Sequence, residues 1–401
     1  MLSPEYLIDC AEEYAYLYSQ LDSDICSDIA RRIAKSGYIT DTAEWQIEKL
    51  RESRAAYAAI ADEIKQMDAS ANKVLRASIL DGAQKALKAD DAIYRALGKR
   101  PASIASSKAM QDLILAGVRK TNGVMHNLTK TTANTASKAF ENALDRAYMQ
   151  VQSGAFSFDQ ALRLVIQDLG RQGYEKIAYP SGTVTRLDAA ARCALMTGLN
   201  QTTAELQLAR MDEMGTDLVE VTAHLGARPT HAVWQGGIYS RSGKHPRYPD
   251  FVRSTGYGSG DGLCGWNCYH SFFPSTEGVS SPTFSNQQRS AQGKTNDQVC
   301  QESQKQRYYE RQVREARREC ATLNSAIGSA GSEELKAMLQ ADFNAAAVKL
   351  KRREAKLEAF CEETHRTLYS NRVQVYGFNK SVSAKAVWAN KKQSPRQSGG
   401  R

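Results

Sequence analysis

The sequence of 401 residues has no apolar run that approaches the ~18 consecutive residues required by a membrane-spanning helix. Its first residues are acidic and rich in tyrosine, and they lack the basic segment and apolar run of a signal peptide. No membrane partner and no secretory leader are therefore expected. Hydrophobic residues make up 42% of the chain, which is enough to form buried cores, so a wholly disordered protein is also excluded.

Cysteine is sparse, with 8 residues scattered along the chain. A secreted disulfide scaffold would be shorter and denser in cysteine, so we expect most of these thiols to be reduced and buried. Only Cys264 and Cys268 are close enough in sequence to suggest joint chemistry.

Acidic residues are absent from Arg372 to the last residue, and most of the formal net charge of +9 lies in this segment. Such a segment cannot bury apolar surface, so residues 371–401 are predicted to form a flexible basic tail. Its expected partner is a polyanion, most plausibly nucleic acid, although a merely solubilising tail remains the alternative. The residues assigned to nucleic-acid contact are Lys380, Lys385, Lys391, Lys392 and Arg396.

Residues 1–215 are predicted to be helical, because Ala, Leu, Glu, Lys, Gln and Arg dominate and strand-like alternation is almost absent. Thr40 or Asp41 is expected to cap one helix, whose apolar positions are Ile47, Leu50, Tyr57, Ile60 and Ile64. Other helices are expected to begin near Ser157 and to end at Gly98, at Gly170 or Gly173, and near Gly215. Because helices gain most of their stability from packed faces, some are expected to pack on another subunit.

The character of the chain changes at residues 216–275, which are rich in β-formers, glycine and aromatic residues. We predict a small mixed α/β module with a β-hairpin, in which Gly236 and Gly237 form the tight turn. Residues 276–297 have the composition of a polar linker, and residues 298–370 are predicted to form a charged helical hairpin. The predicted fold class is therefore α+β, with a mostly helical N-terminal region. The second helix of the hairpin is expected to bury Leu335, Leu339, Phe343, Ala346, Leu350, Leu357 and Phe360.

The string "CGWNCYH" within the module brings Cys264, Cys268 and His270 together in sequence. Cysteine and histidine in reducing surroundings are typical ligands of structural zinc, with His231, or less favourably His224, as a fourth ligand. The spacing between the cysteines is not the tight C-x2-C of a zinc knuckle, and the chain has no second cysteine pair. Zn²⁺ is therefore one hypothesis, and no cofactor is firmly predicted.

Two other interpretations of the cluster remain open. The thiols and the imidazole of His270 are, in the plainest interpretation, packed groups that close a corner of the module. In the other, Cys268 is a nucleophile activated by His231 or His270, which requires a base within hydrogen-bond reach. Since no other part of the sequence resembles a substrate pocket, an enzyme acting on a small molecule is the less favoured class.

The strings "GARPTHAVWQG" and "CGWNCYH" resemble the phage minor capsid protein 2 family of tailed bacteriophages, relatives of the Mu-type minor head proteins. The strings "YPSGTVTRLDAAARC" and "QRYYERQVREARR" are similar to that family in the same order. The resemblance extends to about residue 378 and singles out Arg228, Trp234 and Trp266, beside the Cys/His cluster, as the signature of the module.

This resemblance implies a structural protein of the virion, not an enzyme, located in the capsid interior or at the portal vertex, and present in the host cytoplasm during assembly. The partners it implies are the portal protein, other head proteins and packaged DNA, with roles in head assembly, DNA packaging or DNA delivery. The alternatives are a phage-delivered effector enzyme that uses the Cys/His cluster, and a stand-alone DNA-binding protein. The resemblance itself transfers no catalytic residue to the chain.

Overall fold

The chain folds into two compact units, each assembled from segments that are distant in sequence. Unit 1 comprises Met1–Ala15, Ala69–His126 and Ala189–Lys305, and unit 2 comprises Tyr16–Asp68, Asn127–Asp188 and Gln306–Arg401. The computed structural model describes residues 2–37, 41–129, 132–174, 177–178, 184–285, 290 and 292–393. The domain limits expected from the sequence remain predictions.

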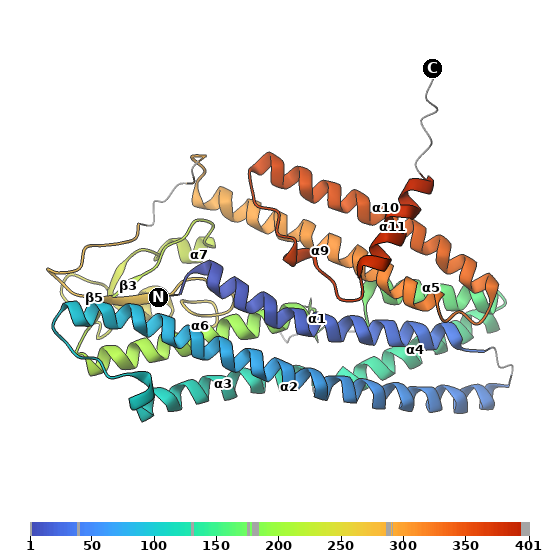
Figure 1. Cartoon of the computed structure of the whole chain (residues 1–401), viewed down its shortest axis with the longest axis horizontal. Helices are drawn as coiled ribbons and strands as arrows, with labels where there is room; N and C mark the ends of the chain where they lie inside the picture. The colour runs from blue at the N-terminus through green and yellow to red at the C-terminus, as the bar shows by residue number, and fades with distance from the viewer. Residues whose placement is uncertain are drawn as a thin grey trace, which may run out of the picture. The chain divides into compact units, whose positions relative to one another are not determined.

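Helices make up most of the described chain (Figure 1). The helices are α1 (Pro4–Lys35), α2 (Thr42–Ala96), α3 (Lys108–Thr129), α4 (Thr132–Gln152), α5 (Phe158–Gln172), α6 (Leu187–Glu213), α7 (Pro229–Ala232), α8 (Phe251–Thr255), α9 (Asn296–Ile327), α10 (Glu333–Thr364) and α11 (Lys380–Gln393), with 3₁₀ turns η1 (Ile104–Ser106) and η2 (Asn371–Val373). The strands are β1 (Ile177–Ala178), β2 (Val184–Thr185), β3 (Leu218–Val221), β4 (Ile238–Ser240) and β5 (Phe272–Ser275). The predicted α+β fold class is confirmed. Among the described residues, no helix is both long and apolar enough to cross a membrane.

The ends of several helices follow the predicted capping signals. The Asp41 side chain accepts a hydrogen bond of 2.8 Å from the backbone of Glu44 at the start of α2, whereas Thr40 lies outside the described residues. Ser157 and Gln160 form a capping box at the start of α5, and Gly173 follows its end with a φ of 76°. Local chemistry therefore sets these boundaries, as the sequence predicted.

In unit 1, a three-stranded antiparallel sheet has the order β4-β3-β5. The central strand β3 is buried along its whole length, and Val219 faces Tyr239 of β4 and Pro274 of β5. Residues of α6, among them Met211, join these strands in one hydrophobic cluster. The sheet is thus fixed by packing on a helix that is distant in sequence from β5.

The predicted position of the hairpin turn is wrong. β3 and β4 do pair antiparallel, but α7 lies in the long connection between them. Gly236 and Gly237 are the last residues of that connection, where the backbone N–H of Gly236 and the carbonyl of Gly237 bond to Val221. Gly236, with a positive φ of 69°, turns the chain into β4 at the end of the long connection, and it is not the centre of a two-residue turn between β3 and β4.

In unit 2, α10 and the part of α9 from Gln306 onward run side by side as a helical hairpin (Figure 1). Each apolar position predicted for α10 is buried, and the face of α9 around Val313, Ala316 and Cys320 is buried as well. Ion pairs link the two helices, with Arg317 bonded to Glu354 at 2.6 Å and Arg353 at 3.5 Å from Glu315. The predicted amphipathic hairpin is confirmed.

The apolar face predicted for α2 is partly wrong. Ile60 is fully buried, but Ile47, Leu50 and Tyr57 are 69%, 47% and 43% exposed. They are spaced by three and seven residues and therefore share one face of the helix. We call Ile47, Leu50 and Tyr57 the α2 stripe.

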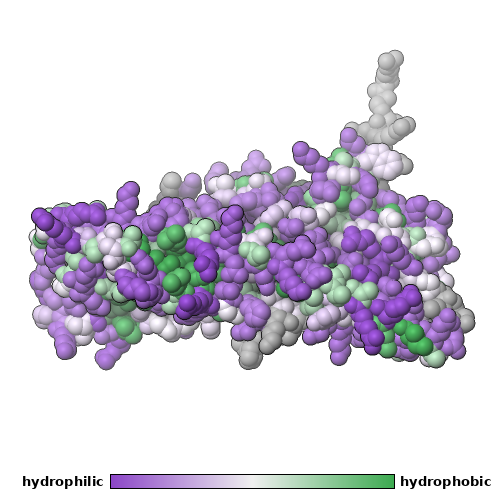
Figure 2. Space-filling view, turned by 60° about the horizontal axis from the view of Figure 1, so that its bottom comes forward, coloured by the Kyte–Doolittle hydropathy of each residue, from purple (hydrophilic) through white to green (hydrophobic). Residues whose placement is uncertain are grey.

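The expectation that some N-terminal helices pack on another subunit remains a prediction. These helices bury many of their apolar residues within the chain, including Leu7, Ile25 and Ile29 of α1. Figure 2 shows one face of the molecule, on which hydrophilic residues dominate and hydrophobic residues gather in small areas. Among the described residues, the α2 stripe is one of several places where large hydrophobic side chains are exposed.

Candidate functional site

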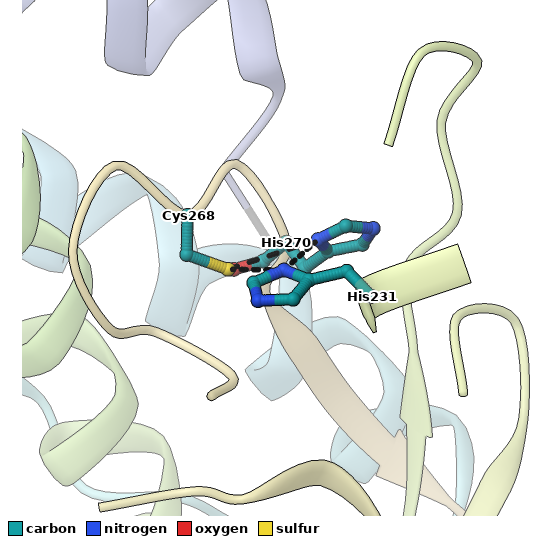
Figure 3. Close-up of side chains that lie close together, drawn as sticks. All are labelled: His231, Cys268 and His270. Carbon is teal, nitrogen blue, oxygen red and sulfur yellow. Dashed lines mark hydrogen bonds between the residues drawn. The ribbon is translucent and has the colours of Figure 1, made fainter. Parts of the chain in front are cut away.

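The cluster predicted from "CGWNCYH" forms in unit 1, where three side chains from two separate segments converge (Figure 3). His231 comes from α7, Cys268 from the loop after α8, and His270 from the residues just before β5. The two Nδ1 atoms lie 3.4 Å apart, and each lies 3.7 Å from the Sγ of Cys268. We call these three residues the Cys/His cluster.

The outer nitrogen of each imidazole has its own hydrogen-bond partner. His231 Nε2 lies 2.8 Å from the backbone carbonyl oxygen of Asp261, and His270 Nε2 lies 2.9 Å from Oε1 of Gln235. The same amide oxygen accepts the backbone N–H of His224 at 3.1 Å, which identifies it as the oxygen. Both partners are therefore acceptors, so both Nε2 atoms carry the proton and both Nδ1 atoms present lone pairs to the cluster.

The loop that carries Cys268 is held by Arg228, one of the predicted signature residues. Arg228 precedes Pro229 at the start of α7, and its guanidinium donates to the carbonyls of Trp266 and Asn267 at 2.8 and 3.1 Å. Asn267 and Cys264 adopt positive φ values of 52° and 59°, which a non-glycine residue rarely does. The guanidinium thus ties the strained loop to the helix that supplies His231.

Two residues of α6 that sequence reasoning missed hold the other side of the loop. Asn200 donates to the carbonyls of Cys268 and His270 at 3.1 and 2.9 Å. Seven residues later on the same helix, Gln207 donates to the carbonyl of Phe272 at 2.7 Å. Their spacing places both on one face of α6, but only the fold shows which carbonyls they meet. The available signal in the sequence was the pair of amide side chains seven residues apart on one predicted helix.

Burial dominates the electrostatics of the cluster. His231, Cys268 and His270 are 2%, 1% and 1% exposed. Burial lowers the pKa of both imidazoles, and it lowers that of His270 to about 2 with help from His224 and His231. Burial also raises the pKa of the Cys268 thiol, against backbone hydrogen bonds that lower it. The neutral forms of both imidazoles and of the thiol are therefore favoured, and their nitrogen and sulfur lone pairs are available to a ligand.

The predicted ligand set is brought together only in part. The Cys264 Sγ contacts the carbonyl of His270 at 3.8 Å, but it does not belong to the group of donor atoms within 4.8 Å of one another. His224 lies beside the cluster, with its ring centroid 4.3 Å from that of His270, and its Nδ1 is 3.2 Å from the carbonyl of Leu225. Neither residue joins the three that converge among the described residues.

Comparison with known sequences identifies the family. The family described as Phage minor capsid protein 2 matches residues 2–362. The chain belongs to this family. A protein of Lactococcus phage LL-H, named "Structural protein", is 24% identical over 286 residues, which cover 68% of this chain and 76% of that protein. No solved structure matches the chain.

This membership confirms the resemblance found in the sequence and makes the protein a bacteriophage structural protein of the virion. The two signature tryptophans of this minor capsid protein lie in different surroundings. Trp234 is buried, with its ring 4.5 Å from that of His231 and 4.9 Å from that of His270. Trp266 is 64% exposed and covers Gly260, where an added Cβ would meet the indole at 2.8 Å.

The C-terminal basic segment of this minor capsid protein differs from the predicted flexible tail. α11 spans Lys380–Gln393 and buries Val382, Ala386 and Ala389 at spacings of four and three, which is the pattern of a packed helix. Lys380 and Lys391 are exposed, and Lys385 donates to Asn324 at 2.8 Å. The side chain of Lys392 and the whole of Arg396 lie outside the described residues.

Proposed function

We propose that this minor capsid protein is a portal-associated component of the phage head that assists head assembly and the packaging or delivery of DNA. The α2 stripe is the observation that carries this proposal. Ile47, Leu50 and Tyr57 are exposed apolar side chains on one face of a long helix, and such side chains on a protein of the virion are suited to a protein neighbour. The portal protein is the neighbour that the proposal assigns to it.

The C-terminal segment supports a contact with packaged DNA. It is basic without acidic residues, and α11 holds the exposed amines of Lys380 and Lys391 on a packed helix. Lysine side chains bind phosphates mainly by charge, and each contact made to DNA releases counterions and steepens the salt dependence of binding.

Burial of the Cys/His cluster supports a structural role over the alternative of an effector enzyme. A nucleophilic cysteine must be reached by its substrate and favours a lowered pKa. Cys268 is 1% exposed and its thiol pKa is raised by burial, which are the properties of a structural cysteine. No specific observation on the described residues favours catalysis.

The portal assignment is tested by incorporation of variants into virions. Leu50→Glu places a charge in the α2 stripe, and it should lower the amount of this protein in purified heads at least tenfold. Leu80→Glu is the matched control, because Leu80 is a leucine of the same helix that is 44% exposed and outside the stripe. Normal incorporation of Leu50→Glu, or cross-links of the stripe only to non-portal proteins, would refute the portal contact.

The DNA assignment is tested by the salt dependence of DNA binding. Lys380→Glu combined with Lys391→Glu should weaken binding and reduce the slope of log K against log salt by about 2, because each phosphate contact contributes about 0.9. Lys336→Glu on α10, another exposed lysine, is the control. Mass spectrometry of full virions and of virions that have expelled their DNA should find the protein in full heads. An unchanged salt slope would remove DNA from the proposal.

A further inference from the structure

The Cys/His cluster contains two hydrogen-bond acceptors, the Nδ1 atoms of the histidines, but only one hydrogen that can be donated to them, that of the Cys268 thiol. Because both Nε2 protons are used outside the cluster, the Nδ1 lone pairs of His231 and His270 face each other across 3.4 Å. The thiol of Cys268 carries a single proton and lies 3.7 Å from each of them. One buried nitrogen therefore lacks a donor within the cluster, and such a group is costly unless another hydrogen-bond donor or a cation satisfies it.

We propose that His231, Cys268 and His270 bind one Zn²⁺ ion through the two Nδ1 atoms and the Sγ atom. The ion replaces the thiol proton, which leaves to solvent on binding, and it is the electrophile that all three lone pairs face. The proposal depends on the geometry of the cluster and is independent of the portal and DNA assignments above.

The distances between the donor atoms fit zinc. Zinc binds imidazole nitrogen at about 2.0–2.1 Å and thiolate sulfur at about 2.3 Å. Tetrahedral angles then place two nitrogens about 3.4 Å apart and a nitrogen and a sulfur about 3.6 Å apart. The observed separations of 3.4, 3.7 and 3.7 Å agree with these values to within about 0.2 Å, the tolerance expected of a metal site.

The surroundings of the cluster are those of metal-binding histidines. A ligand histidine usually donates its other N–H to a carbonyl or carboxylate, which fixes the ring and the tautomer. Here the carbonyl of Asp261 and the amide oxygen of Gln235 take that role at 2.8 and 2.9 Å. Asn200 in turn holds the carbonyls of Cys268 and His270. The ligands are thus oriented before an ion arrives.

Zinc is assigned because the donor set contains two imidazoles and one thiolate, which suit this borderline ion better than magnesium or calcium. With three protein ligands, a water molecule completes the tetrahedron. All three ligands are at most 2% exposed, so a substrate does not reach the ion, and its role is structural. It would join α7 to the loop of residues 256–271.

The first experiment uses the whole chain of 401 residues. Protein purified from zinc-supplemented cells is expected to contain about one zinc per chain by elemental analysis. After chelation, titration with Co²⁺ should produce visible bands of tetrahedral Co²⁺ with one sulfur charge-transfer band, saturating at one equivalent. Chelation should also lower the thermal midpoint. Zinc below about 0.1 per chain together with no Co²⁺ bands would overturn the proposal.

The second experiment separates ligands from neighbours. His231→Ala, Cys268→Ser and His270→Ala should each weaken Co²⁺ binding by more than about 100-fold, and Gln235→Leu by about 10–100-fold. Cys264→Ser is the matched control, since this cysteine is equally buried and four residues from Cys268, and it should keep the full metal content. Circular dichroism of each variant confirms that it folds. If Cys264→Ser lost the metal while folded, or Cys268→Ser kept it, the three-residue site would be wrong.

Discussion

Polar side chains make different kinds of contact in the module of unit 1 and between helices of unit 2. In unit 1, buried amides bond to backbone carbonyls of the module, as Asn200 does to Cys268 and His270. In unit 2, charged side chains pair with each other across helices, as Arg163 does with both oxygens of Asp342 at 2.7 and 2.8 Å. The loop of the module in unit 1 thus relies on bonds from side chain to main chain, and the contact between α5 and α10 in unit 2 relies on bonds between side chains. Each unit also has bonds of the other kind, as between Arg210 and Asp91 in unit 1 and between Arg353 and the carbonyl of Gln312 in unit 2.

The difference follows from where backbone groups find their partners. A helix satisfies the N–H and C=O groups of its interior, so its side chains are free to pair with those of a neighbouring helix. The loop of residues 256–271 has no ladder, and its buried carbonyls require donors from elsewhere. Amides of α6 and the guanidinium of Arg228 supply those donors. Irregular backbone therefore depends on particular polar side chains for its hydrogen bonds, whereas the interior of a helix does not.

The largest effect is expected where a side chain serves buried carbonyls. Asn200→Ala removes the donors to two carbonyls and should cost about 2–4 kcal/mol of the free energy of unfolding, measured in urea. Hydrogen exchange should increase in residues 264–271. Gln201→Ala, at the next position of α6, should change the stability by less than about 0.5 kcal/mol. Equal costs for the two variants would contradict the role of Asn200 in bonding the buried carbonyls.

The packing of α3 against α6 in unit 1 depends on two glycines, and its contribution to stability can be tested separately from that of the polar contacts. Gly117 and Gly198 let α3 and α6 approach closely, because Thr202 covers the first and Thr121 covers the second. A Cβ at residue 198 would lie 2.0 Å from the Thr121 hydroxyl, so Gly198→Ala should cost about 1–3 kcal/mol. Gly123→Ala on α3 meets no atom within 4 Å and should stabilise by about 0.5–1 kcal/mol. Thermal unfolding of both variants distinguishes a packing effect from helix propensity.

A smaller effect is expected for an ion pair of unit 2. Arg163→Ala leaves the carboxylate of Asp342, which is 6% exposed, without its bidentate partner and should cost about 1–2 kcal/mol. Lys336→Ala removes the exposed pair with Glu333 and should be neutral within about 0.5 kcal/mol. Urea unfolding at low and high salt measures both. A cost for Arg163→Ala as large as that for Asn200→Ala would remove the distinction between the units.

The smallest effect concerns pH. Burial, together with the charges of Asp24 and Asp28, raises the pKa of Glu63 from 4.5 to about 7. A carboxyl group with a raised pKa favours the folded state most below pH 4.5, and this contribution is lost as the pH rises through 7. Between pH 5 and 8, the free energy of unfolding should fall by about 1 kcal/mol more in the unsubstituted protein than in Glu63→Gln. The expected difference is small because Glu63 is only half-buried. Parallel pH profiles for both proteins would contradict the assignment.

The sequence predicted the helical hairpin well and the module less well. The apolar positions of α10 from Leu335 to Phe360 repeat at helical spacing, and all are buried. In the module, Gly236 and Gly237 resembled a hairpin turn, but the chain forms α7 just before them. Periodicity reports contacts that recur along one element, whereas a turn in an irregular loop depends on distant partners. The prediction that the residues of the α2 stripe are buried was also wrong, because the spacing of apolar residues does not reveal whether another part of the chain covers them.

The sequence by itself determined the family, the helical majority, the ends of several helices and the residue types available for a metal site. These features depend on local propensity, capping and repeated spacing, which a linear chain displays directly. Only the tertiary structure decided that His231 joins Cys268 and His270 while Cys264 and His224 do not, and that Asn200 and Gln235 support them. That choice depends on the direction of side chains brought together from α6, α7 and the loop before β5, which spacing along the chain does not encode.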